Sequence, residues 1–455
     1  MRILLISPSD SFFVNYSRSK KSVCVALPLL AAYTPREHDV IVADQGYGDN
    51  VYHEGIDLVG ISAMTAQAYQ GYKIAKYYKE RGVKVVMGGI HASVLPEEAA
   101  GHVDAVCVGE ADSLWGQILE DAAANRLKKI YKSQDLFPME EVPHLRSDLI
   151  RRKRTSFSHT VIQASRGCPY NCEFCITSAM FGRKFRFRPV DHVIDEIKRS
   201  KGKLIFFVDD NIFGSPAYSE ELFKKLLPLK LQWCGQASLH TLTRDLGLLK
   251  LAKKSGALGF FMGLESVNEL SRQISTSGAK LGTSTLSEIS KKIRLVLGHR
   301  ILVHTSIIFG LDGDGPMVFE KTVDFLKTNS VFISSFCILT PYPGTRIYQR
   351  FKEEGRLLHE DWSRYSNENV VFTPKLMTPQ QLKDGSDWAG RALYTWPSII
   401  KRSFSNWHHP IYYSVLNVYT RWANHTNHGP GSIISMNRLD KEDWLKSCMT
   451  AKGVN

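Results

Sequence analysis

The chain has 455 residues, of which 43% are hydrophobic and 23% are charged, so it is long enough to form two or three hydrophobic cores. It contains no run of eighteen apolar residues, and residues 1–8 read as a short strand and not as a signal peptide, which excludes a membrane-spanning protein and predicts a cytoplasmic one. The net charge of +13 excludes neither an enzyme nor a nucleic-acid-binding protein.

Residues 1–140 alternate apolar strands with helical stretches, a pattern typical of an open parallel sheet covered on both faces. The apolar runs predict strands at 2–7, 39–43, 58–62, 83–88 and 105–108, and helices at 66–81 and 114–124. We therefore expect an α/β domain with a doubly wound sheet of the Rossmann or flavodoxin kind. Such sheets bind ligands at the carboxyl ends of their strands. Here these ends carry Ser62, Thr65, Gly88, Gly89, His91, Gly109 and Glu110.

Three cysteines, Cys168, Cys172 and Cys175, form the most specific feature of the chain. Their spacing fits a loop that places three thiolates around one face of an iron–sulfur cluster and leaves one iron open. Zinc would need a fourth Cys or His nearby, and no His lies between Val161 and Val190. A disulfide would leave one thiol over. The loop follows a predicted strand at 160–164, the end at which parallel barrels have their active sites.

Residues 167–175, which read GCPYNCEFC, resemble the signature of radical S-adenosylmethionine (SAM) enzymes. The resemblance implies that Cys168, Cys172 and Cys175 bind a [4Fe–4S] cluster whose open iron binds the amino and carboxylate groups of SAM. It further implies that one electron cleaves SAM to a 5′-deoxyadenosyl radical, that an external donor of the flavodoxin or ferredoxin type supplies that electron, and that the substrate is a small molecule or a lipid.

A second unit, within residues 141–375 and preceded by a linker, repeats strand and helix. Strands are predicted at 160–164, 204–208, 231–237, 259–263, 301–309 and 332–339. Six such units imply a partial (β/α)6 barrel of the TIM type, open on one side, with its chemistry at the carboxyl ends of the strands.

Polar residues at these ends fit the same resemblance. Residues 207–211 resemble the second-strand motif that holds the SAM amino group, which implies that role for Asp209 and Asp210. A helix-capping turn is the alternative interpretation for Asp210. Gln236, Ser238 and Glu265 are expected at the SAM carboxylate or ribose, and residues 307–312, which begin with Ile307, resemble the segment that packs on adenine.

Residues 59–65 and 86–98 resemble the cobalamin-binding domain that one large class of radical SAM enzymes carries. Classical cobalamin modules have an Asp-x-His-x-x-Gly motif after the first strand, but residues 7–13 read SPSDSFF, with no His. The cobalt would then lack a protein imidazole, and His91 is expected to make a loop hydrogen bond instead. Two interpretations remain: cobalamin binds without a His ligand, or the domain is a scaffold without it.

The last region, residues 376–455, departs from the alternating pattern and is expected to be helical. Between Tyr394 and Trp422 it contains eight large aromatics, at positions 394, 396, 404, 407, 412, 413, 419 and 422. We favour a helical cap over the open side of the barrel with these side chains buried, since aromatic stripes on helices are usually core. The alternative is an interfacial surface that takes an amphiphilic substrate from a membrane.

The sequence therefore predicts a radical SAM enzyme, with cobalamin-dependent C-methylation of an unactivated carbon in a lipid or secondary metabolite as the leading reaction. A non-methylating radical reaction, such as deoxygenation or dehydration, ring contraction or carbon–carbon bond formation, is the alternative within enzymes. A tRNA-modifying enzyme is the alternative of another class. The chain shows no appended nucleic-acid-binding module, which disfavours a nucleic-acid partner. Oligomeric state and substrate identity do not follow from these residues.

Overall fold

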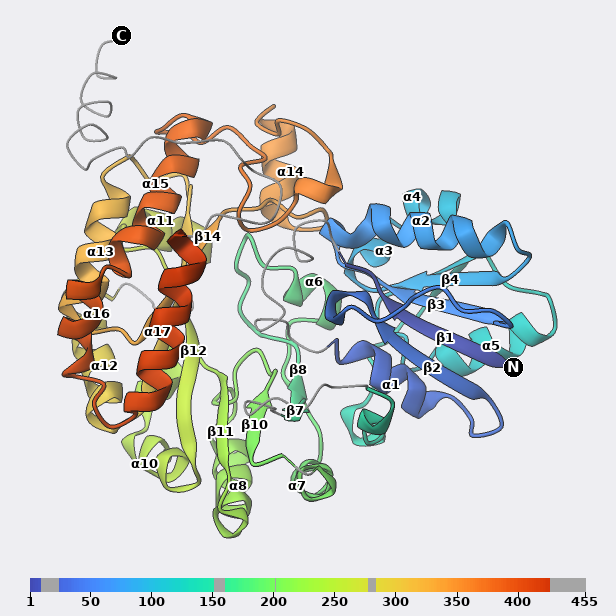
Figure 1. Cartoon of the computed structure of the whole chain (residues 1–455), viewed down its shortest axis with the longest axis horizontal. Coiled ribbons are helices and arrows are strands. Elements are labelled where there is room, and N and C mark those ends of the chain that lie inside the picture. The colour runs from blue at the N-terminus through green and yellow to red at the C-terminus, as the bar shows by residue number, and fades with distance from the viewer. Residues whose placement is uncertain (10–23, 151–159, 201, 277–283, 426–455) are drawn as a thin grey trace.

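A computed structural model of the chain describes residues 1–9, 24–150, 160–200, 202–276 and 284–425. Residues 10–13, the basic run 151–154 and residues 426–455, on which parts of the sequence predictions rest, lie outside these ranges. Figure 1 shows the N-terminal α/β unit beside a second, larger α/β unit, with the C-terminal helices on the side of the second unit away from the first.

The N-terminal sheet has six parallel strands in the order β2-β1-β3-β4-β5-β6. They are β1 (Arg2–Ser7), β2 (Asp39–Asp44), β3 (Leu58–Ser62), β4 (Lys84–Gly88), β5 (Ala105–Val108) and β6 (Ile130–Lys132). The order reverses at β1, so the predicted doubly wound sheet is confirmed, and its switch point lies between β1 and β3. The last strand, β6, is too short to stand out as an apolar run and was not predicted from the sequence.

Helices cover both faces of this sheet, which is why the central strands are apolar on both sides. On one face α1 (Ala26–Tyr33) and α5 (Trp115–Ala123) share a core with β1 and β5. On the other lie α2 (Ala68–Lys79), α3 (Ile90–Val94) and α4 (Pro96–His102).

The second sheet has six parallel strands in the order β14-β13-β12-β11-β10-β7. These are β7 (Thr160–Ile162), β10 (Leu204–Phe207), β11 (Gln232–Gln236), β12 (Ala257–Glu265), β13 (Leu302–Phe309) and β14 (Ile333–Ile338). The predicted partial barrel is therefore confirmed, because the sheet is sequential and its outer strands, β7 and β14, are not neighbours. A short antiparallel pair, β8 (Ser165–Arg166) and β9 (Arg186–Phe187), together with α6 (Thr177–Phe181), encloses the cysteine loop.

Helices pack on the outer face of this sheet. They are α7 (Val190–Arg199), α8 (Pro216–Leu226), α9 (Leu239–Arg244), α10 (Leu246–Lys254), α12 (Leu286–Gly298), α13 (Val318–Thr328) and α14 (Arg346–Glu353). The short helix α11 (Glu269–Thr276) follows β12 in the chain. Strand β13 shows the two faces clearly: Val303 and Ile307 are buried in the outer core, whereas His304, Ser306 and Ile308 alternate with them and are partly exposed. The alternating positions therefore line the inner face of the barrel.

One segment after the barrel belongs to the packing of the N-terminal unit. Tyr348, Trp362, Tyr365 and Val371 lie in the same hydrophobic core as α2, α3 and α4. The Trp362 indole Nε1 also donates to Glu98 Oε2 over 2.9 Å. The boundary predicted at residue 375 assigns these residues to the barrel, but in the structure they complete the core of the first unit and join the two.

The C-terminal helices are α15 (Pro379–Leu393), α16 (Trp396–Ser403) and α17 (Pro410–His425). Ile399 and Tyr413 pack on Leu258, Leu302 and Ile333 near the starts of their strands. Helix formation in this region matches the prediction up to residue 425. No helix in the described ranges is both long and apolar enough to cross a bilayer.

The expectation that the aromatics of this region are buried is only partly correct. Tyr394 and Tyr413 are buried, but Trp396, Phe404, Trp407 and Trp422 are 49%, 76%, 65% and 58% exposed. The expectation was wrong for these four because the buried face of the helices carries polar residues instead, among them Arg402.

Arg402 fixes these helices to the barrel, and its removal gives a test of the packing. The fully buried guanidinium donates to the carbonyl oxygens of Val331, Phe332 and Leu393 and to the Asn417 side chain. Arg402→Ala leaves these acceptors without a donor and should lower the free energy of unfolding by about 3 kcal/mol, measured by chemical denaturation. The exposed neighbour Lys401 is the control, since Lys401→Ala should leave that free energy unchanged.

Candidate functional site

The cysteine loop begins at a position that only glycine can occupy. Gly167 has a φ of +85°, and a Cβ there would clash with the carbonyl oxygens of Lys184 and Phe181. Cys168 and Cys172 are buried, and Cys175, whose amide donates to the Cys172 carbonyl over 3.2 Å, is partly exposed. The three thiols are thus presented by one tight loop beyond β8.

The donor chemistry of this loop fits an iron–sulfur cluster. In the described part of the chain, no three His, Cys, Asp or Glu side chains already surround a point at which a metal ion would fit. The loop nevertheless supplies three thiols, and its one carboxylate, Glu173, is held by Arg350 and does not compete as a ligand. Binding of the cluster by Cys168, Cys172 and Cys175 stays a prediction, and it requires the thiols to turn toward a common centre.

A buried ion-pair network joins the base of this loop to the N-terminal unit. The Arg166 Nη1 lies 3.2 Å from Glu110 Oε1 and 3.0 Å from Asp112 Oδ2, and all three side chains are at most 7% exposed. Arg186 adds a second contact, 2.7 Å from Glu110 Oε1. Because these charges are shielded from water, the network fixes the loop after β5 against the loop that carries the cysteines.

Glu110 has a role different from the predicted contact with cobalamin. Both of its carboxylate oxygens are used, because Oε2 accepts from the Phe137 amide over 2.9 Å and from Arg186. Burial alone would raise the pKa of Glu110, but hydrogen bonds from Arg186 and the charge of Arg166 outweigh it and lower the pKa. Glu110 is therefore an ionised link between the two units.

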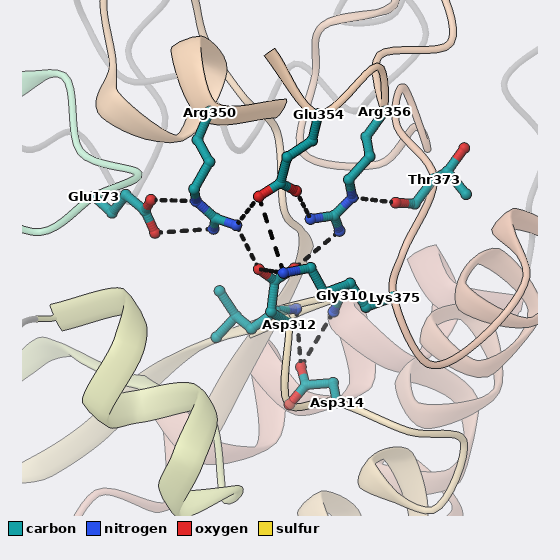
Figure 2. Close-up of polar contacts among 10 residues, drawn as sticks. Glu173, Gly310, Asp312, Asp314, Arg350, Glu354, Arg356, Thr373 and Lys375 are labelled. Carbon is teal, nitrogen blue, oxygen red and sulfur yellow. Dashed lines mark hydrogen bonds and ion pairs between the residues drawn. The ribbon is translucent and has the colours of Figure 1, made fainter. Parts of the chain in front are cut away.

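A second set of contacts holds the cysteine loop from the other side (Figure 2). The Arg350 guanidinium, on α14, binds both oxygens of Glu173, at 2.7 and 3.2 Å, and also lies 2.6 Å from Asp312 Oδ2. The start of the same helix contributes the Ile347 amide, which donates to the Glu173 carbonyl over 3.2 Å. Sequence reasoning did not assign a role to Glu173 or Arg350, because only the fold brings them together.

Asp312, after β13, is the hub of this second set. Besides Arg350 it pairs with Arg356 at 2.9 Å and with Lys375 at 3.2 Å, as Figure 2 shows. The buried Asp314 nearby accepts from the amides of Gly310 and Leu311 and fixes the turn that follows the strand. The loop after β13 and the cysteine loop are thus held in one charged network.

The two neighbouring carboxylates after β10 lie in different environments. Asp209 is buried and accepts from the Ala164 amide at 3.1 Å and the Ser165 hydroxyl at 2.5 Å. Burial raises the pKa of Asp209 to about 6, and the hydrogen bond from Ser165 opposes that rise. Asp210 is exposed, and its Oδ1 accepts from the Thr177 hydroxyl on α6 over 3.2 Å. Of the two predicted contacts of the SAM amino group, Asp210 is the accessible one.

The other predicted SAM contacts also include both buried and accessible side chains. Ser238 is buried and caps α9 by accepting from the Thr241 amide at 3.2 Å, whereas Gln236 is partly exposed. Ile307 is fully buried in the outer core, so its side chain does not face the inner surface where adenine was expected.

Glu265 has a strained backbone at the end of β12. Its φ is +62°, which a residue with a Cβ rarely adopts, and the register between β12 and β13 shifts at this position. Gly263 accommodates it, because a Cβ at Gly263 would overlap the Glu265 carboxylate. Strain of this kind at a strand end supports the prediction that Glu265 contacts a ligand, and that contact stays a prediction.

The strand ends of the N-terminal sheet retain features that fit a cofactor. The Thr65 hydroxyl is buried and has no hydrogen-bond partner within the described residues, and a Cβ at Gly109, whose φ is +84°, would meet open space. Ser62 is partly exposed. Gly89, with a φ of +90°, serves a different purpose, since a Cβ there would lie 2.8 Å from the Ala63 backbone. At Gly88 a Cβ would make only an ordinary contact with Cys107, at 3.6 Å, and contact of either glycine with cobalamin stays a prediction.

His91 lies inside the N-terminal unit. Its Nε2 is 2.7 Å from the Tyr72 hydroxyl and 3.5 Å from Glu98 Oε1, and its ring is fully buried. Burial lowers the pKa of His91 in spite of the nearby Glu98 carboxylate, so the ring is neutral at pH 7. The ring would have to leave this position to touch a ligand, and the absence of a protein imidazole on cobalt stays a prediction.

Comparisons with known proteins assign both units. Residues 26–118 match the B12 binding domain and residues 162–326 match the Radical SAM superfamily. The bacteriochlorophyllide d C-12(1)-methyltransferase of Chlorobaculum tepidum is 30% identical over 410 residues, which cover 88% of each chain. The hopanoid C-2 methylase of Rhodopseudomonas palustris is 26% identical, over 76% of this chain and 67% of that protein.

A solved structure shows the same fold. The radical SAM methyltransferase TsrM from Kitasatospora setae, with cobalamin and a [4Fe–4S] cluster bound, superposes with a TM-score of 0.65 at 14% identity. The match covers 93% of this chain and 99% of TsrM. The arrangement of both sheets is therefore shared along nearly the whole of each chain.

The contrast between the two carboxylates after β10 gives the first test of this site. Asp209→Ala should weaken iron retention by about tenfold, because it releases the segment before the cysteines. Asp209→Asn keeps an acceptor for Ala164 and should retain iron. Asp210→Ala should retain iron but weaken SAM binding by about tenfold. Iron content and SAM affinity after anaerobic reconstitution check these outcomes, and full iron in Asp209→Ala would contradict the anchoring role.

The second test concerns the bidentate contact of Arg350 with Glu173. Arg350→Ala should lower the retention of iron by about tenfold, since the loop loses a bidentate partner next to Cys172. Arg350→Lys should be intermediate, because an ammonium supplies charge without the paired geometry. Arg199→Ala, which breaks an exposed pair with Asp195 on α7, is the matched control and should bind iron as the wild type does.

Proposed function

Because this chain belongs to the radical SAM enzymes that carry an N-terminal B12-binding domain, we propose that it transfers a methyl group to an unactivated carbon of an apolar small molecule or lipid. The cofactors of this methyltransferase family are a [4Fe–4S] cluster, SAM and cobalamin. When bound, they supply an organic radical that removes a hydrogen atom from the substrate and a methyl group that replaces it.

One observation carries the proposal: the network of Arg166 with Glu110 and Asp112 holds the strand ends of the first unit against the cysteine loop. A cofactor at either site would then lie beside the other, which a reaction that uses both requires. This arrangement favours methylation over a reaction in which the first unit is only a scaffold. We include an external one-electron donor of the flavodoxin or ferredoxin type in the proposal.

The residues of this chain would orient the reactants. Asp210 is an accessible carboxylate beside the cysteine loop and suits the cationic amino group of SAM. Glu265 lies at the end of β12, two strands from β10 in the same sheet, and suits a hydroxyl donor such as ribose. Arg350 and Arg166 would hold the loop itself, and the buried pair of Arg166 with Glu110 would exclude water from its base.

The inner face of the barrel supports an apolar substrate. Phe206, Phe261 and Ile308 are partly exposed at alternating strand positions on this face. Among them, the His304 Nε2 is 2.8 Å from the Ser335 hydroxyl, and the ring of Phe261 packs on the ring of His304 at 4.8 Å. Relatives named for bacteriochlorophyllide and hopanoid act on large ring systems, which agrees with such a surface. We propose a polycyclic apolar substrate.

The cysteines test the radical step. Cys168→Ala, Cys172→Ala and Cys175→Ala should each abolish the anaerobic formation of 5′-deoxyadenosine, because two thiolates do not hold a cluster with one open iron. Cys234→Ala, outside the motif, is the control and should retain it. Formation of 5′-deoxyadenosine at the wild-type rate by any motif variant, measured by chromatography, would overturn the assignment.

The products distinguish methylation from its alternatives. With cobalamin and a polycyclic substrate, the wild type should form a product one methyl group heavier, together with 5′-deoxyadenosine and S-adenosylhomocysteine. Mass spectrometry of the product checks this. Consumption of the substrate without a mass gain, accompanied by 5′-deoxyadenosine, would show a non-methylating radical reaction.

A further inference from the structure

The two last helices present apolar side chains to solvent along one face each. On α16 and the turn after it, every third or fourth residue is exposed and large, and the same holds on α17. These residues are Trp396 (49%), Ile400 (57%), Phe404 (76%), Trp407 (65%), Ile411 (71%), Val415 (43%), Val418 (43%) and Trp422 (58%). We call this set the apolar stripe. It lies on the side of the barrel away from the N-terminal unit (Figure 1).

The buried faces of the same helices carry several polar residues beside the apolar Ile399 and Tyr413. Arg402 and Asn417 are fully buried, Asn406 is 3% exposed and Thr420 is 7% exposed. The amide of Asn417 donates to the Phe332 carbonyl over 3.2 Å, so these polar groups attach the helices to the barrel. A helix at a water-facing surface normally has the opposite arrangement. An exposed apolar face of this kind is typical of a surface that binds a partner or a membrane.

The charge around the apolar stripe is positive. Residues 388–425 contain no Asp or Glu, whereas Lys401 is exposed and the guanidinium of Arg421 lies 5.0 Å from the centre of the Trp396 ring. One further cation stands beside the helices, because Lys253 Nζ donates to the Arg300 carbonyl oxygen over 2.7 Å, and His409 Nε2 contacts the same oxygen at 3.1 Å. An anionic surface complements this region.

We propose that the apolar stripe binds the surface of a lipid bilayer that contains anionic lipids. Tryptophan and phenylalanine on one face of a helix, with basic residues at the margin, are suited to the boundary between headgroups and acyl chains. A second copy of the chain would bring the same positive charge to the contact, and this repulsion disfavours self-association there. The binding is peripheral, because no described helix is long and apolar enough to span the bilayer. It goes beyond the proposed methylation and does not depend on it.

Vesicle binding tests the proposal with the full-length chain carrying its reconstituted cluster. At low salt the wild type should sediment with vesicles of equal parts phosphatidylglycerol and phosphatidylcholine, and less with phosphatidylcholine alone. The combined variant Phe404→Ser, Trp407→Ser and Ile411→Ser should bind at least about tenfold more weakly, since it removes three exposed apolar anchors. Lys401→Glu should weaken binding only to the anionic vesicles.

Matched controls separate this surface from general hydrophobicity. The combined variant Leu227→Ser, Leu246→Ser and Leu286→Ser removes three leucines of 39%, 43% and 37% exposure outside the stripe and should bind vesicles as the wild type does. Both triple variants should form 5′-deoxyadenosine normally, which shows that they fold. Three results would each overturn the proposal: no binding of the wild type to anionic vesicles, full binding by the stripe variant, or a wild-type dimer in sedimentation analysis that the stripe variant converts to monomer.

Discussion

The cysteine loop depends on arginine–carboxylate pairs on both of its sides, which are buried at Arg166 and partly exposed at Arg350. Arg166 holds its base to Glu110 and Asp112, and Arg350 holds Glu173 to Asp312. The loop has little regular structure of its own, so its position is set by these partners from other parts of the fold. Charge-assisted bonds in places that water does not reach are directional as well as strong, and they define the orientation of the loop more narrowly than apolar contact would.

Arginine–carboxylate pairs also join the two α/β units, and apolar contacts form a second connection. Burying charges costs solvation free energy, and such pairs contribute geometry more reliably than net stability. The apolar part of the junction is supplied by residues that follow the barrel: Trp362 and Tyr365 enter the core of the first unit. Trp362 also donates to Glu98, the carboxylate beside His91, so packing and hydrogen bonding act on the same place. The two units are therefore parts of one packed structure.

The C-terminal helices are held to the barrel in a different way. They attach to the barrel through Arg402 and Asn417, whose hydrogen bonds satisfy carbonyl groups at the ends of barrel elements. Most of their large apolar residues then face the outer surface. The proposed lipid-binding surface and the proposed substrate face would thus belong to the same barrel.

The sequence by itself determined every strand of the two parallel sheets except β6, the order of the two units and the spacing of the three cysteines. Apolar runs and cysteine spacing are local signals that can be read without knowledge of the fold. Both ends of every strand predicted for the barrel lie within two residues of the observed ends. The tertiary structure alone decided which side chains meet. Glu173 and Arg350 form a pair although they are 177 positions apart, and Glu110 forms ion pairs with arginines. Asp209 accepts hydrogen bonds from the segment before the cysteines, whereas Asp210 is accessible. Four aromatic side chains of the C-terminal helices face outward. The physical reason is that a carboxylate or an aromatic ring has the same local pattern whether its partner is a cofactor, an arginine or solvent, and only the packing of distant segments supplies that partner.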